Sequence, residues 1–207
     1  MATATPTTAK GRATRERIVR AAAELVSERG VAAVSLDDVG RRAPASRSQL
    51  YHYFDDKDAL VRAVVDATTD AVLGAQDGLL EHLDTWAGLD RWFGALVALQ
   101  RERQARGGCP IGSLAGQLAE RDPRARIAIA TGLDRWEAHL RAGLTRMRQR
   151  GALAPEADPA ALATATMANL QGGLLLTQVR RDPEQLRVAL AAARTVLRGA
   201  RGDRGGG

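Results

Sequence analysis

The segment that decides the fold is "SLDDVGRRAPASRSQLYHYFDDKDAL", residues 35–60. It contains two short stretches that each begin with a serine, Ser35 and Ser46. Serine is a favoured residue at the N-cap of a helix, and Ser46 with Gln49 forms the serine-x-x-glutamine pattern of a capping box. The segment therefore predicts two short helices that are separated by only a few residues.

A longer amphipathic helix is expected before this segment, from about Thr14 to Arg29. One of its faces is apolar and consists of Ile18, Ala22, Leu25 and Val26. Two short helices that pack on a longer one form a helix-turn-helix unit, in which the second short helix enters the major groove of DNA. This part of the chain is therefore expected to bind DNA.

The second short helix begins with polar side chains that are suited to reading DNA. Arg47 can donate two hydrogen bonds to guanine, and Gln49 can pair with adenine. Leu50 and Phe54 are expected to face the core instead, whereas Lys57 can contact a phosphate at the start of the following helix. The residues that we expect to contact DNA are Arg12, Arg15, Ser35, Ser46, Arg47, Ser48, Gln49, Tyr51, His52, Tyr53 and Lys57.

Charge and composition also favour a nucleic-acid partner. The net charge of the 207 residues is +6, and residues 1–50 contain nine basic and five acidic side chains, which makes +4 of that total. A positive balance of this kind suits a polyanion. A compositional bias of the genome would produce the same preference for arginine, so both explanations stay open.

Two strings in this region resemble the TetR family of transcriptional regulators. They are "RERIVRAAAELVSERGVAAVSLDDVGRRA", residues 15–43, and "SRSQLYHYFDDKDAL", residues 46–60. The resemblance implies an all-α homodimer of about nine helices. Its three N-terminal helices would bind a double-stranded operator, and its C-terminal domain would bind a small-molecule inducer and dimerise through the last two helices.

The expected organisation has four parts. Residues 1–11 form a disordered N-terminal arm, and residues 12–58 form the helix-turn-helix domain. Residues 59–199 form the helical domain for ligand binding and dimerisation, and residues 200–207 form a disordered tail. Further helices are expected over about Thr85–Arg103, after Cys109–Pro110, over about Pro123–Arg150, and from Pro159 and Pro183 onward.

Pro44 departs from the family pattern, which has glycine in the turn between the two short helices. Glycine suits that turn because the turn favours a positive φ, which proline is not expected to adopt. Proline also disfavours helical geometry at Ala43. Two outcomes are open: the first short helix ends early and the turn repacks, or the second helix is displaced and DNA binding weakens.

The longest uncharged run, Pro159–Val179, has the length of a membrane span. Its threonines, amides and glycines favour a buried helix in a non-membrane protein instead. Together with the last helix it is expected to form a four-helix interface between two copies, over about residues 159–198. The alternative is that both helices belong to the core of a single copy.

A ligand site is expected among the helices of the C-terminal domain, where polar or amphipathic groups interrupt apolar faces. The candidate residues are Trp92, Cys109, Trp136, His139, Asn169 and Gln171. Cys109 precedes a helix start, which can lower the pKa of a thiol and make it a sensor of oxidants or electrophiles. The other interpretation of Cys109 is a small buried hydrophobic residue.

No motif for catalysis, metal binding or a cofactor is present in the sequence, so an enzyme is not expected. The polar N-terminus lacks the apolar core of a signal peptide, and we expect a cytoplasmic protein. The leading hypothesis is a ligand-responsive regulator, most simply a repressor that an inducer releases from DNA. An activator, and a DNA-binding or partner-binding helical protein without a ligand, remain alternatives.

Overall fold

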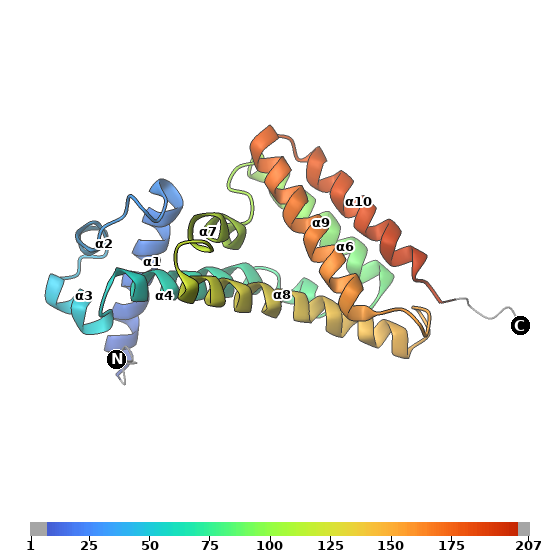
Figure 1. Cartoon of the computed structure of the whole chain (residues 1–207), viewed down its shortest axis with the longest axis horizontal. Coiled ribbons are helices and arrows are strands. Elements are labelled where there is room, and N and C mark those ends of the chain that lie inside the picture. The colour runs from blue at the N-terminus through green and yellow to red at the C-terminus, as the bar shows by residue number, and fades with distance from the viewer. Residues whose placement is uncertain (1–7, 203–207) are drawn as a thin grey trace, which may run out of the picture. The chain divides into compact units, whose positions relative to one another are not determined.

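The structure, a computed structural model, describes residues 8–202, and all the regular elements in that range are helices (Figure 1). The prediction of an all-α fold is confirmed. Ten helices occur among the described residues, because the short α5 adds to those expected. The helices are α1 (Ala9–Arg29), α2 (Leu36–Arg42), α3 (Arg47–Tyr53), α4 (Lys57–Gly74), α5 (Asp77–Leu80), α6 (Trp86–Glu102), α7 (Pro110–Leu118), α8 (Pro123–Gln149), α9 (Pro159–Arg180) and α10 (Glu184–Gly199).

The chain divides into two compact units. The first contains the described residues up to Val72 together with Ser113–Gly132, and the second contains Leu73–Gly112 and the chain from Leu133 onward. The first unit therefore extends beyond the boundary expected at residue 58. Two contacts join the added segments to it: the backbone N–H of Val31 donates to Oε1 of Gln117 at 2.8 Å, and Gly132 lies against the side chain of Thr69 on α4.

The first helix begins earlier than the apolar pattern predicts. Its first residue is Ala9, because the hydroxyl of Thr8 caps the helix by accepting a hydrogen bond from the backbone N–H of Gly11 at 3.1 Å. The expected start near Thr14 was therefore wrong, and residues 9–11 belong to α1 and not to a disordered arm. The rest of the expected arm, residues 1–7, lies outside the described residues.

Side-chain caps start the later helices as their sequences predict. The carboxylate of Asp122 accepts hydrogen bonds from the backbone N–H groups of Arg124 and Ala125, at the start of α8. Asp158 caps α9 in the same way through the N–H of Ala160, at 2.9 Å. These contacts satisfy donors that have no partner inside the helix, which is why the chain turns helical at these points.

In the second unit, α9 and α10 lie side by side and are joined by a short turn (Figure 1). Gly173 of α9 permits this packing, since a Cβ there would lie 2.8 Å from the Cβ of Ala189 on α10. The hydroxyl of Thr177 also accepts a hydrogen bond from the backbone N–H of Leu186. Between residues 8 and 202, α9 included, no helix has both the length and the hydropathy that crossing a membrane requires.

The C-terminal end is more ordered than its composition predicts. Arg201 forms an isolated antiparallel bridge with Leu153, and its guanidinium carbon lies 5.7 Å from the ring centroid of Trp86. The N–H of Ala154 donates to the carbonyl of Ala200 at 3.0 Å. Residues 200–202 therefore do not belong to a disordered tail, and the remainder of the expected tail lies outside the described residues.

Candidate nucleic-acid interface

Packing determines which face of α3 is available to a partner. Leu50 is 2 % exposed and Phe54 is 1 % exposed, so both turn inward as expected. Arg47, Tyr51 and His52 are exposed in consequence. The capping box is confirmed: the backbone N–H of Ser46 donates to Oε1 of Gln49, and the N–H of Gln49 donates to Oγ of Ser46.

Four of the residues expected to contact DNA surround one surface hollow of about 340 Å³. Its wall consists of Ala32, Ala33, Val34, Ser35, Leu36, Asp37, Arg47, Tyr51 and Lys57. The structure thus brings together the start of α2, the start of α3 and the first residue of α4. A hydroxyl, a guanidinium, a phenol and an ammonium on one surface are the groups that contact phosphates and base edges in DNA.

Arg47 is held in place by its neighbours in this hollow. Its guanidinium carbon lies 5.7 Å from the ring centroid of Tyr51, one helical turn away, which is a cation–π distance. A hydrogen bond to Tyr51, together with the charges of Tyr51 and Asp37, raises the pKa of Arg47. Asp37 did not emerge from the sequence as a site residue, because only the fold brings it to the same hollow as Arg47.

Two of the expected contacts are more restricted than their residue types indicate. The side-chain oxygen of Gln49 accepts the N–H of Ser46 in the capping box, so only its NH₂ group is uncommitted by that contact. Tyr53 is 9 % exposed, and its ring lies edge-on to that of His52, with centroids 4.8 Å apart. Tyr53 therefore contributes to packing, and its contact with a phosphate stays a prediction, as do the contacts of the exposed Ser48 and His52.

Two basic residues of α1, Arg12 and Arg15, belong to the same unit as α3. The guanidinium carbon of Arg15 lies 5.3 Å from the ring centroid of Phe54, so this arginine covers the C-terminal end of α3. Arg12 is exposed one turn nearer to the start of α1. Both are therefore placed on the helix that supports α3, and their contact with DNA stays a prediction.

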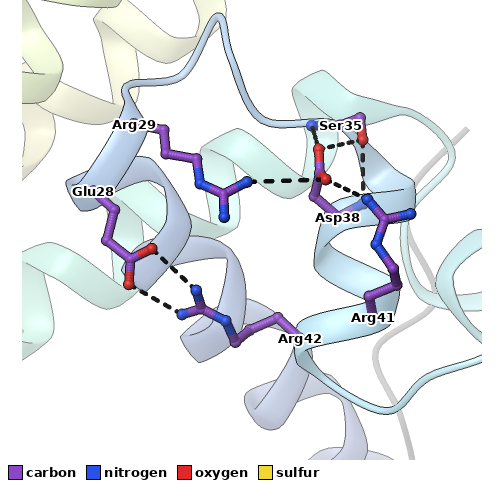
Figure 2. A network of polar contacts seen from close by, with 6 residues as sticks. All are labelled: Glu28, Arg29, Ser35, Asp38, Arg41 and Arg42. Carbon is purple, nitrogen blue, oxygen red and sulfur yellow. Dashed lines mark hydrogen bonds and ion pairs between the residues drawn. The ribbon is translucent and has the colours of Figure 1, made fainter.

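Ion pairs join α1 to α2 (Figure 2). The two guanidinium nitrogens of Arg42 lie 3.2 and 3.0 Å from the two carboxylate oxygens of Glu28. This hydrogen bonding lowers the pKa of Glu28, and hydrogen bonds from Ser35 lower the pKa of Asp38. Arg41 and Arg42, at the end of α2, are thus paired with acidic side chains. The number of basic residues in positions 1–50 therefore overstates the positive charge that is available to DNA.

The turn between α2 and α3 contains Pro44, which has no backbone N–H to donate. Helix α2 ends at Arg42, with Ala43 as its C-cap, and α3 starts normally from Ser46. The proline therefore leaves the capping box of α3 intact, and its effect on DNA binding stays a prediction.

Replacing Pro44 by glycine is expected to cost less stability than the same change at an ordinary exposed proline. Glycine at position 44 supplies a backbone N–H, and a hydrogen bond from it is worth about 0.5–1.5 kcal/mol, which offsets the ~0.4–1 kcal/mol that glycine gives up through the unfolded chain. Denaturant unfolding followed by circular dichroism measures the change. The matched control is Pro155→Gly in an exposed turn, which should lose stability. A loss at Pro44 of the same size as at Pro155 would show that the new N–H adds nothing to the turn.

The residues expected to bind a ligand differ in their surroundings in the second unit. Trp92 is fully buried, and its indole N–H donates to Oε1 of Gln76 at 2.9 Å, as a core residue would. Asn169 donates to the carbonyl of Ala165 on its own helix. His139 lies near the surface. These observations leave Trp136 and Gln171 as the better candidates.

Four buried polar atoms of this unit have no hydrogen-bond partner among residues 8–202: Nε1 of Trp136, Nε2 of Gln171, Oε1 of Gln100 and Nε of Arg194, whose guanidinium is otherwise paired with Asp90. A buried polar group without a partner costs on the order of 1–3 kcal/mol, so each has a reason to accept a partner from a ligand. The sequence did not identify Gln100 as a ligand-binding candidate. Its spacing could have indicated that it is buried, since it follows Trp92 and Leu96 at intervals of four on the buried face of α6.

Cys109 lies beside Gln171 but is not activated. The thiol is 8 % exposed, and the backbone N–H of Gly112 donates to Sγ at 3.4 Å. Burial raises the pKa of the Cys109 thiol, and the backbone N–H of Gly112 offsets this only in part. Nε2 of Gln171 makes no hydrogen bond to the neutral thiol, and it would donate to the sulfur only if the thiolate formed. Of the two interpretations of Cys109, the small buried hydrophobic residue is the one that this environment favours.

Alkylation of Cys109 is expected to be slow in the native protein, at least ~10-fold slower than in the unfolded chain at neutral pH, because only the thiolate reacts. Iodoacetamide labelling followed by mass spectrometry measures the two rates. Cys109→Ser serves as the blank. If the native thiol reacted as fast as the unfolded one and DNA binding fell in step, Cys109 would be a sensor.

Within residues 8–202 no group of three histidine, cysteine, aspartate or glutamate side chains is placed to hold a metal ion. Residues 18–64 match the family described as bacterial regulatory proteins, tetR family. Residues 86–193 match the tetracyclin repressor-like C-terminal domain.

Several known regulators are similar in sequence to this protein over most of its length. An uncharacterized HTH-type transcriptional regulator of Mycobacterium tuberculosis is 31% identical over 192 residues, which cover 88% of this chain and 93% of the relative. The transcriptional regulator AcuR of Cereibacter sphaeroides is 27% identical, over 83% of this chain and 79% of its own. A TetR transcriptional regulator from Chloroflexus aurantiacus shares the fold, with a TM-score of 0.77 at 24% identity over 94% of this chain and 99% of that one. Since both parts of the chain match and the helix-turn-helix geometry is present, this protein belongs to the TetR family of DNA-binding transcriptional regulators.

Proposed function

We propose that this regulator is a repressor that binds a palindromic operator as a homodimer and leaves it when a small-molecule inducer binds. The observation that carries the DNA-binding part is the hollow shared by Ser35, Arg47, Tyr51 and Lys57. Arg47 would read guanine, while Ser35 and Lys57 would contact phosphates on either side of the groove. The protein would therefore act in the cytoplasm, where bacterial DNA lies.

Exposed apolar side chains on α9 and α10 support the homodimer. Leu175 is 60 % exposed and Val179 is 71 % exposed, and they lie one helical turn apart. Val188 and Val196 of α10 are about half exposed. A second copy that packs its own α9 and α10 on this surface would remove these side chains from water, and the resulting two-fold axis matches a palindrome.

The unpaired polar atoms of the second unit support an inducer site. Trp136 and Gln171 each offer a buried N–H donor, and Gln100 offers an acceptor. A ligand with one donor and two acceptors on an apolar body would satisfy them. The inducer releases DNA only to the extent that it binds the released conformation more tightly than the DNA-bound one.

Selection from a random duplex library, followed by fluorescence anisotropy, tests the proposal. The selected duplex should bind at least ~10³-fold more tightly than a scrambled duplex and should carry inverted half-sites about one DNA turn apart. Measurements at two salt concentrations report the phosphate contacts. Equal affinity for both duplexes would refute the operator, and selection of a single half-site would refute the palindrome.

The inducer is tested separately, by thermal shift against a library of small apolar molecules that carry hydrogen-bonding groups. A true inducer should stabilise the free protein, release the selected duplex, and lose both effects with Gln171→Leu. Asn169→Leu is the matched control, because the amide of Asn169 already donates to its own helix. A compound that stabilises the protein without releasing DNA is not an inducer.

A further inference from the structure

The turn between α2 and α3 lacks one of the hydrogen bonds that would normally hold it. The N–H of Ala45 donates to the carbonyl of Gly40 at 3.0 Å. This is the outer of the two hydrogen bonds of a Schellman motif, which links residues five positions apart. The inner bond of that motif, between residues three positions apart, would run from the N–H of residue 44 to the carbonyl of Arg41. Proline has no N–H, so this bond cannot form.

The turn lies directly before α3, which starts only two residues after Ala45, and so it affects how α3 is oriented. Because one of the two backbone hydrogen bonds of the motif is missing, a contact from outside the turn has more effect than it would on a turn closed by both bonds.

Arg17 of α1 supplies such a contact. Its Nε–H donates to the carbonyl oxygen of Ala43 at 3.0 Å, across 26 residues of sequence. This carbonyl belongs to the peptide bond that enters Pro44, so holding its oxygen fixes the plane of that peptide. Close packing adds to the restraint, because a Cβ on Gly40 would lie 3.1 Å from both the carbonyl oxygen of Ala45 and Cδ1 of Leu50.

We propose that Arg17 is a positioning residue for operator binding, which holds the Ala43–Pro44 peptide and so orients α3 for the major groove. Arg17 acts on DNA through the turn and not by contacting a phosphate. Its role depends on the proline: glycine at position 44 would supply the missing N–H, and the turn would no longer need a distant support. Arg17 would serve in this way in a repressor or in an activator.

The test combines Arg17→Met with Pro44→Gly and measures affinity for the duplex selected by the wild-type protein. Arg17→Met alone should weaken operator binding about 10-fold or more, the usual cost of removing a hydrogen bond to a charged group. In the Pro44→Gly background the same change should cost less than ~3-fold, because the turn holds itself. An equal loss in both backgrounds, or no loss in either, would overturn the proposal.

Salt dependence separates positioning from a direct phosphate contact. Removing a side chain that neutralises a phosphate lowers the slope of log affinity against log salt by about 0.9 and weakens scrambled DNA as well. Arg17→Met should leave both the slope and the affinity for scrambled DNA unchanged. Arg20→Met is the matched control, since Arg20 is exposed on the next turn of α1 and removes the same charge without touching the turn. A lowered slope in Arg17→Met would overturn the proposal.

Unfolding experiments without DNA keep the test independent of the operator. The loss of stability caused by Arg17→Met should shrink in the Pro44→Gly background, whereas additive losses would show that Arg17 does not hold the turn.

If the single variant failed to fold, a folded double variant with the operator affinity of Pro44→Gly would support the proposal, and an unfolded one would overturn it. If the wild-type protein selected no operator, the proposed function would fail while this coupling still decided the role of Arg17.

Discussion

Replacing Val179 by glutamate is expected to leave the protein monomeric and to reduce operator affinity by at least ~10²-fold. Val179 is 71 % exposed on the face of α9 that we assign to the partner copy. A carboxylate there would be buried without a partner in the dimer. A monomer engages one half-site and loses the gain that comes from linking two binding units, which is on the order of 10²–10⁴.

Sedimentation velocity measures the oligomeric state, and anisotropy on the selected duplex measures the affinity. Ile127→Glu is the matched control, because Ile127 is 58 % exposed on α8 in the first unit, whereas α9 and α10 belong to the second. That variant should remain dimeric. A Val179→Glu protein that stayed dimeric would place the interface on another surface, and a monomer with full operator affinity would remove the need for a dimer.

Replacing Arg47 by alanine is expected to weaken operator binding at least ~30-fold and to relax the preference for guanine at one position of each half-site. A two-pronged arginine contact with guanine is worth about 1–3 kcal/mol of discrimination, and a symmetric dimer makes it twice. Arg47 lies at a cation–π distance of 5.7 Å from Tyr51, so Tyr51→Ala is expected to weaken the same contact less than Arg47→Ala does. Affinities for the selected duplex and for duplexes substituted at that guanine measure the change.

Lys57→Ala provides the contrast to Arg47→Ala. Lys57 lies in the same hollow, at the start of α4, where a phosphate contact is expected. This variant should weaken operator and scrambled DNA alike and lower the salt slope by about 0.9 for each phosphate that the lysine no longer neutralises. If Arg47→Ala behaved like Lys57→Ala, Arg47 would be a phosphate contact, and base reading would belong to another residue of α3.

Much of the interface could be predicted from sequence because short-range signals carry it. The capping box of Ser46 and Gln49, and the inward pair Leu50 and Phe54, depend on residues three or four apart, and the structure shows both. The predicted start of the first helix was wrong because it was taken from the apolar residues alone. Thr8 caps α1 ahead of those residues, and their spacing does not indicate how far a polar first turn extends.

Other features depended on residues that are distant in sequence. Asp37 meets Arg47 only because α2 and α3 fold around one hollow, and Gln100 lacks a partner among residues 8–202 only because α6 is buried along that face. Cys109 shows the same limit, since a helix start favours the thiolate whereas burial, which raises the pKa of the thiol, opposes it. Burial is a property of the packed chain, and sequence spacing does not report its extent.

By itself, the sequence determined the all-α fold, the position of the helix-turn-helix and the exposed polar residues at the start of its second helix, because caps and apolar periodicity act within one or two helical turns. The tertiary structure alone decided which contacts reach the turn at Pro44. Proline has no N–H with which to close the turn locally, and the carbonyl of Ala43 accepts a hydrogen bond from Arg17, 26 residues away.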